Sequence, residues 1–133
     1  MTARFFADTN IPVYALSADA EKRKKALALL RRNPVISVQV VNEFITVAVN
    51  KMKLTRPDAN RLASVMMKRC EVVPMDAAMV AEAISLGERL QLSHWDSLIV
   101  AAALRAGCDA LYSEDMQHGQ LIDNKMTILN PFC

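Results

Sequence analysis

Short apolar runs alternate with longer segments of helical periodicity along this chain, and this alternation restricts the fold more than any other feature of the sequence. The apolar runs predict five strands, at residues 4–7, 35–38, 70–75, 110–113 and 126–129. The periodic segments predict helices at residues 19–32, 39–51, 55–69, 76–91 and 93–107. Strands separated by a dozen or more helical residues need crossover connections, which are usually right-handed and give parallel pairing. We therefore expect an α/β fold with a mainly parallel five-stranded sheet and helices on both of its faces.

The length and composition of the chain indicate one domain. A chain of 133 residues, of which 53% are hydrophobic, can bury roughly two-thirds of its unfolded surface. No repeat, low-complexity tract or flexible linker divides it, so we expect a single domain over residues 1–133. No stretch approaches the ~18 uninterrupted apolar residues of a membrane span, and Arg4 and Asp8 interrupt the apolar run that a secretory signal would need. We expect a cytoplasmic protein that makes no contact with a membrane.

The counts of cysteine, histidine and glycine argue against several kinds of site. The three cysteines and two histidines are too widely spaced for a disulfide framework or a structural zinc site. The three glycines form neither a dinucleotide-binding fingerprint nor a phosphate-binding loop. Residues 1–69 carry 13 Lys or Arg against 5 Asp or Glu, whereas residues 70–133 carry 3 against 9. This division is compatible with a nucleic-acid partner on a basic face, and also with ordinary solvated helices.

Three aspartates stand where expected strands end or helices begin. Asp8 directly follows the first strand, and Asp115 lies two residues beyond the end of the fourth. Functional groups of an open parallel sheet gather beyond the carboxyl ends of its strands, so we expect these two carboxylates on one edge of the sheet. Asp96 lies in the first turn of its helix, where the partial positive charge of the helix end stabilises an anion.

Glu43 is the single charged residue on the polar side of an otherwise apolar helix. The polar residues of that helix recur every three or four positions and form one narrow stripe: Gln39, Asn42, Glu43, Thr46 and Asn50. Surface helices usually carry several charges on the side that faces water. A stripe of amides, a hydroxyl and one acid therefore favours a polar cleft.

Each acid also has a purely structural interpretation. Asp8 and Asp115 suit turns, Asp96 suits a helix cap together with Ser93, and Glu43 suits a solvent-facing position. Several carboxylates brought within a few Å of one another repel, and they either take up protons or bind a cation. Oxygen donors without cysteine or paired histidine favour Mg²⁺ or Mn²⁺, which can polarise a phosphoryl oxygen and activate water. Three neighbouring polar residues are suited to orient the carboxylates or waters: Thr9, Asn10 and Ser113.

Four short motifs carry these acids. They are residues 6–10 (Phe-Ala-Asp-Thr-Asn), 41–44 (Val-Asn-Glu-Phe), 95–103 (Trp-Asp-Ser-Leu-Ile-Val-Ala-Ala-Ala) and 112–116 (Tyr-Ser-Glu-Asp-Met). On these motifs the sequence resembles the PIN-domain nucleases, and among them the small VapC-type toxins of bacterial toxin-antitoxin pairs. The resemblance spans nearly the whole chain. Each motif is weak by itself, whereas all four in this order and strand context make a strong signal.

The resemblance implies a Rossmann-like sheet and a ribonuclease that is specific for single strands. It also implies a homodimer, and an antitoxin protein whose segment enters the groove of the active site. The Mg²⁺ or Mn²⁺ site that it implies consists of four acids: Asp8, Glu43, Asp96 and Asp115. Glu114 competes with Asp115 for the fourth place, and we prefer Asp115 because the family has a hydroxyl residue two positions before its acid, as Ser113 is here.

Other functions are compatible with parts of this pattern. A catalytically silent PIN-like module would bind RNA or a protein partner without turnover, but the retention of all four acids argues against it. A haloacid-dehalogenase-like phosphatase needs a second aspartate where this chain has Asn10. Trp95 is expected to pack in a core or an interface rather than to stack on a nucleobase, and His118 is expected on a surface loop.

Overall fold

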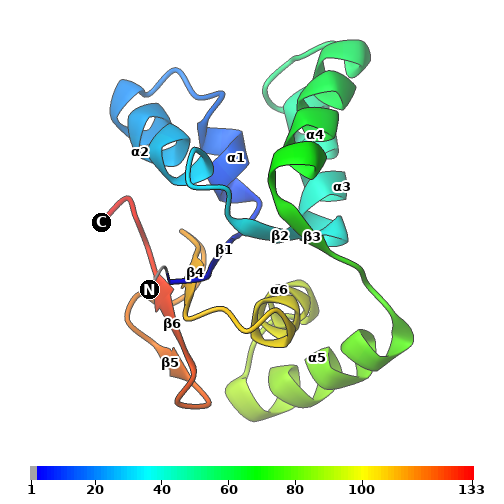
Figure 1. Ribbon diagram of the computed structural model, residues 1–133, viewed down its shortest axis with the longest axis vertical. Coiled ribbons are helices and arrows are strands. Elements are labelled where there is room, and N and C mark those ends of the chain that lie inside the picture. The colour runs from blue at the N-terminus through cyan, green and yellow to red at the C-terminus, as the bar shows by residue number, and fades with distance from the viewer. Residues whose placement is uncertain (1–2) are drawn as a thin grey trace.

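The computed structural model describes residues 3–133, and these residues form a six-stranded sheet and six helices (Figure 1). The strands are β1 (Phe5–Ala7), β2 (Val35–Ser37), β3 (Glu71–Val73), β4 (Ala110–Tyr112), β5 (Leu121–Ile122) and β6 (Met126–Leu129). The helices are α1 (Asn10–Tyr14), α2 (Ala20–Leu30), α3 (Val38–Asn50), α4 (Arg56–Arg69), α5 (Ala77–Leu90) and α6 (His94–Arg105). The α/β class and the mainly parallel sheet expected from the sequence are confirmed.

The sheet has the strand order β3-β2-β1-β4-β6-β5, and every neighbouring pair is parallel except β5 and β6. Phe6 of β1 is aligned with Val35 of β2 and with Leu111 of β4, and Leu111 is aligned in turn with Ile128 of β6. Phe6, Leu111 and Ile128 have no exposed surface. Parallel strands that are buried on both faces have continuous apolar sequences, which is why these strands are recognisable in the sequence.

Helices cover both faces of the sheet. In Figure 1, α5 and α6 lie together on one side of strands β1 to β3, and α1 to α4 lie on the other side. Helix α6 packs against both β2 and α5, and every residue from 97 to 103 is buried. This packing fixes the position of the α6 N-terminus, where Asp96 lies.

Four helices begin at the capping residues that the sequence predicts. The side chains that accept hydrogen bonds from the first-turn N–H groups belong to Asp19, Thr55, Asp76 and Ser93. At α6, for example, Ser93 Oγ accepts from the backbone N–H of Asp96 at 3.1 Å. Such caps satisfy N–H groups that have no partner within the helix.

The bounds of most elements lie within one or two residues of those expected, as for β3, expected at residues 70–75 and observed at Glu71–Val73. Larger differences occur at three places. Helix α1 was not expected, because five residues are too few to show helical periodicity. Strand β5 adds a sixth strand to the expected five: it pairs with β6 through a turn in which Asp123 and Asn124 have φ of 51° and 54°, a conformation that Asp and Asn tolerate. Val38 was expected to end a strand and instead begins α3, because the Ser37 side chain caps that helix.

The three cysteines, Cys70, Cys108 and Cys133, are free thiols. Burial raises the pKa of the Cys108 thiol to about 11, so it is not an activated nucleophile. No helix within residues 3–133 combines the length and the apolar character that a membrane crossing requires.

Candidate active site

Asp8 is a buried carboxylate at the carboxyl end of β1, with 6% of its surface exposed. Its Oδ2 accepts a hydrogen bond from Ser113 Oγ at 2.8 Å, and its Oδ1 accepts one from the backbone N–H of Thr9 at 2.7 Å. Burial raises the pKa of Asp8 to about 6; the bonds from Ser113 and Thr9 oppose this rise, and the charges of Asp115 and Asp96 add to it. The ionised form of Asp8 is therefore costly in this position, and a nearby cation would stabilise it.

The loop after β4 brings Asp115 to the same edge of the sheet. Ser113 Oγ, which donates to Asp8, also accepts from the backbone N–H of Asp115 at 3.2 Å. Asn10 Nδ2 donates to Asp115 Oδ2 at 3.1 Å, and Asn10 Oδ1 accepts from the backbone N–H of Glu114 at 3.3 Å. These bonds join the ends of the neighbouring strands β1 and β4, so Asn10 and Ser113 hold the two aspartates in a fixed relation.

Glu43 approaches this edge of the sheet from α3. Its Oε1 accepts a hydrogen bond from Thr9 Oγ1 at 2.7 Å and one from Gln39 Nε2 at 3.5 Å. Asn42 and Thr46 line the same cavity as Gln39 and Glu43. The polar stripe of α3 therefore faces a cleft over these four residues, as its spacing predicts.

Asp96 lies in the first turn of α6, and its side chain is half-buried. Burial raises its pKa, the hydrogen bond with Ser93 opposes the rise, and the charges of Asp115 and Glu43 add to it. Asp96 thus takes part in the helix-capping interaction and also lies within the electrostatic reach of the other acids. The helix-capping role that the sequence suggests for Asp96 is therefore compatible with a place among the acids of the cleft.

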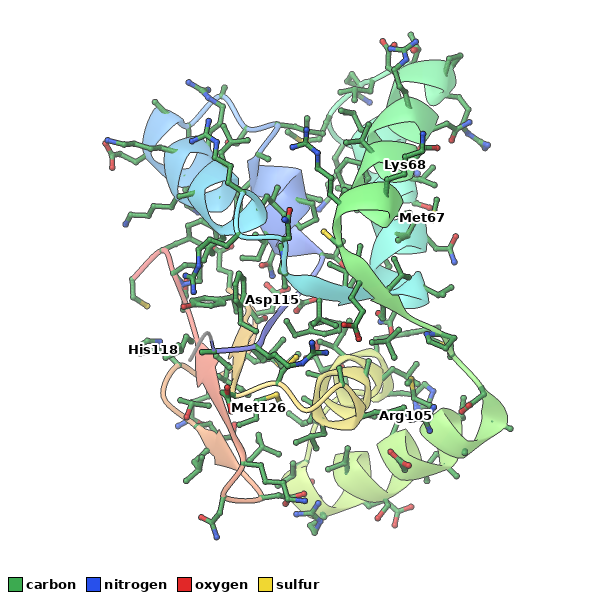
Figure 2. The ribbon with its side chains drawn as sticks, viewed as in Figure 1. Met67, Lys68, Arg105, Asp115, His118 and Met126 are labelled. Atoms are coloured by element: carbon green, nitrogen blue, oxygen red, sulfur yellow. The ribbon has the colours of Figure 1, made fainter. Side chains whose placement is uncertain are left out.

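One cavity of about 760 Å³ is lined by all four acids: Asp8, Glu43, Asp96 and Asp115. Thr9 and Asn10 also line it, whereas Ser113 is fully buried. Figure 2 shows Asp115 near the middle of the view and His118 toward one side, beside β6. The topology therefore collects side chains from β1, α3, α6 and the loop after β4.

The donor chemistry of this cavity fits a divalent ion. Its four carboxylates supply the oxygen ligands that Mg²⁺ and Mn²⁺ prefer, and the pKa values of Asp8 and Asp96 are raised mainly by burial and further by the charges of neighbouring acids. In the described part of the chain, no three acidic, histidine or cysteine side chains are grouped closely enough to hold an ion as they stand. Asp115 is exposed and Glu43 half-buried, so these two side chains have room to turn toward an ion beside Asp8.

The Glu114 carboxylate is engaged in a separate cluster beside the acids. It accepts hydrogen bonds from Tyr14 Oη and from Lys22 Nζ, the latter at 3.0 Å, and Lys22 also lies 4.5 Å from the centre of the Tyr14 ring. Although burial acts to raise the pKa of Glu114, these two bonds lower it overall. The adjacent Asp115 makes no ion pair among the described residues. This difference favours Asp115 over Glu114 as an acid available to an ion.

Of the two positions expected for Trp95, a core or an interface, the structure contradicts the core, and the interface stays a prediction. Its side chain is 62% exposed and lines the cavity, because the first turn of α6 projects beyond the layer in which residues 97–103 are buried.

Tyr14 also lines the cavity, and it was not singled out from the sequence. Its position four residues after Asn10 was the available signal, but it is informative only once α1 is known. His118 lies on an exposed loop as expected, and its Nδ1 accepts from the backbone N–H of Asn130 at 2.8 Å.

The sheet order, the helices on both faces and the acids at the carboxyl edge define a Rossmann-like α/β domain with an acidic cleft. The sequence matches the family model of the PIN domain over residues 5–121, and the chain belongs to the PIN domain family. The resemblance found in the sequence is thereby confirmed. No curated protein sequence matches the chain.

Solved structures with similar folds include toxin-antitoxin proteins. A toxin-antitoxin complex from Klebsiella pneumoniae has a TM-score of 0.71 and 19% identity, with 98% of each chain covered. VapC20 from Mycobacterium tuberculosis, a toxin that cleaves the sarcin-ricin loop, has a TM-score of 0.68 and 18% identity, covering 84% of this chain and 91% of that one. The DNA-bound VapBC from Salmonella typhimurium has a TM-score of 0.71 and 18% identity, covering 99% and 100%. At these identities the likeness concerns the fold.

Proposed function

We propose that this protein is an endoribonuclease that hydrolyses RNA phosphodiester bonds with Mg²⁺ or Mn²⁺ bound by Asp8, Glu43, Asp96 and Asp115. The observation that carries the proposal is the convergence of these four acids on one cavity, with the pKa of Asp8 raised to about 6. A divalent ion bound there would supply positive charge toward a phosphoryl oxygen and lower the pKa of water. The membership of the PIN domain family supports this reaction class.

The neighbouring polar residues have positioning roles in this proposal. Ser113 and the Thr9 backbone hold the two oxygens of Asp8, and Asn10 holds Asp115. The Thr9 hydroxyl holds Glu43. These bonds keep the acids at one edge of the sheet before a substrate arrives, and the exposed Asp115 and half-buried Glu43 side chains would turn toward Asp8 when an ion binds.

We further propose that the protein is the VapC-type toxin of a type II toxin-antitoxin pair, acting in the cytoplasm. Its partners would be the RNA substrate, a cognate antitoxin protein and a second copy of the chain in a homodimer. The support is the fold likeness to the toxin-antitoxin proteins of Klebsiella pneumoniae and Salmonella typhimurium. A gene for a small DNA-binding protein next to the gene for this chain would support the antitoxin part of the proposal.

The nuclease proposal is tested by cleavage of a labelled single-stranded RNA by purified wild-type and Asp8→Asn proteins. We expect cleavage by the wild type with Mg²⁺ or Mn²⁺, none in EDTA, and only background cleavage by Asp8→Asn. Asp58→Asn is a matched control, because Asp58 is an exposed aspartate at the start of α4 and does not line the cavity. An Asp8→Asn protein that cleaves at the wild-type rate would refute the proposal.

Calorimetry separates this function from the alternative, a PIN-like module that binds RNA or protein without turnover. The nuclease should bind Mn²⁺, and Asp115→Asn should weaken that binding. A silent module whose acids are structural should bind none. The lining of one cavity by all four acids favours the nuclease; burial raises the pKa of Asp8 and Asp96, and the charge of Asp115 adds to both rises.

A further inference from the structure

A second hollow, of about 340 Å³, lies beside the acidic cavity. Its apolar wall consists of Val38, Met75 and Trp95, which are 39%, 37% and 62% exposed. These side chains come from the start of α3, the segment between β3 and α5, and the start of α6. The tertiary structure therefore assembles a branched alkyl group, a thioether and an indole into one exposed surface.

The hollow and the acidic cavity share part of their lining. The shared residues are Gln39, Asn42, Glu43 and Trp95. An RNA strand that places one phosphate at the acids would therefore have a neighbouring nucleotide within reach of the hollow. This continuity distinguishes Trp95 from the other exposed apolar side chains, such as Leu121 of β5, which lines neither space.

The backbone of Trp95 is held by its surroundings. Its backbone carbonyl accepts a hydrogen bond from Gln39 Nε2 at 3.3 Å, and Gln39 is only 6% exposed. The His94 ring meets the indole edge-on, with 5.7 Å between the ring centres. Because the chain is buried from Ser97 onward, the backbone that carries the indole is anchored, and the rigid indole has only two side-chain torsions to order on binding.

We propose that Val38, Met75 and Trp95 form a subsite for one unpaired nucleobase of the RNA substrate, next to the phosphate that is cleaved. This inference rests on the proposed function. A base presents a flat apolar face, which suits the indole, and a hydrogen-bonding edge, which suits the exposed amide of Asn42. A base within a duplex is already stacked on both faces, so the subsite selects single strands.

The fluorescence of Trp95 provides a direct test, because the chain contains no other tryptophan. Full-length protein is titrated with a short fluorescein-labelled single-stranded RNA, with Ca²⁺ as the divalent ion and RNA integrity checked on gels. An abasic oligomer of the same length and an RNA duplex are the comparison ligands. We expect the single strand to quench the Trp95 emission, whereas the abasic oligomer and the duplex leave it unchanged.

Substitutions give a second, independent measurement. Anisotropy of the labelled RNA should show binding weakened roughly 5- to 150-fold by Trp95→Ala, as expected for the loss of one stacked base, and largely retained by Trp95→Phe. Leu121→Ala is the matched control, because it removes a comparably exposed apolar side chain and should bind like the wild type. Since Trp95 is exposed, neither substitution at this position disturbs the core.

Four outcomes would overturn the subsite. RNA binding without quenching, or equal affinities for the wild type and Trp95→Ala, would show that no base stacks there. Protection of Trp95 from acrylamide in the RNA-free protein would show that a second copy of the chain covers it. Failure to bind any single strand would also exclude it. The nuclease proposal is judged separately, by cleavage with Mn²⁺: cleavage with unchanged Trp95 emission overturns the subsite alone.

Discussion

Replacement of Asp8 by asparagine should stabilise the metal-free protein while removing its proposed activity. Burial raises the pKa of Asp8 from 3.8 to about 6. At about 1.4 kcal/mol for each tenfold change in proton affinity, ionised Asp8 lowers the free energy of unfolding by about 3 kcal/mol. Asparagine carries no charge, and its amide can bond the Thr9 N–H and Ser113 Oγ at a cost of at most about 1 kcal/mol. The expected net gain is about 2–3 kcal/mol.

The stabilisation expected from Asp8→Asn depends on pH, and the direction of that dependence follows from the raised pKa of Asp8. The folded state binds a proton at Asp8 more tightly than the unfolded state does, so between pH 3.8 and about 6 the contribution of Asp8 to stability falls as pH rises. Below this window Asp8 is protonated in both the folded and the unfolded state, so the substitution leaves the free energy of unfolding unchanged. Above this window the substitution gives its full increase in the free energy of unfolding. The stabilisation by Asp8→Asn should therefore be largest at neutral pH and should vanish at acid pH.

Thermal unfolding in EDTA measures this gain. For a domain of this length, 1 kcal/mol corresponds to roughly 3–4 °C in Tm, so Asp8→Asn should raise Tm by about 6–12 °C at neutral pH. Asp76→Asn is a control of opposite sign. The pKa of Asp76 is lowered, chiefly by the Met79 backbone N–H and also by Arg105, so loss of its charge should lower Tm. An unchanged or lower Tm for Asp8→Asn at neutral pH would refute the reasoning.

Three further predictions concern activity and packing. Asp115→Asn should reduce RNA cleavage by about 100-fold or more, whereas Glu114→Gln should change it by less than about 10-fold; equal losses would contradict the separate roles of these acids. Gly87→Ala would place its Cβ 2.7 Å from Ser97 Oγ and should lower the free energy of unfolding by about 1–3 kcal/mol in chemical denaturation, and the loss should shrink in a Ser97→Ala background. Phe6→Ala should cost about 3–5 kcal/mol in the same assay, and a smaller cost would show that the core collapses around the cavity.

The sequence was sufficient to predict those helices and strands whose position depends on residues within the same short segment. Capping residues such as Asp19 and Ser93 mark helix starts because their side chains bond N–H groups two or three residues away. The four main crossover strands and β6 are recognisable from apolar runs, because both faces of the sheet are covered. The five-residue α1 and the two-residue β5 are too short for any period, and β5 is stabilised by antiparallel pairing with the next strand, β6.

The sequence by itself determined the α/β class, the capped starts of four helices, the three aspartates at strand ends and a helix start, and Glu43 on the polar stripe of its helix. Only the tertiary structure decided the state of those acids. The burial of Asp8, the pairing of Glu114 with Lys22 and the exposure of Trp95 each depend on groups that are distant along the chain. Desolvation and ion pairing depend on what surrounds a side chain in space, and a parallel sheet with crossover connections brings that environment from many parts of the sequence.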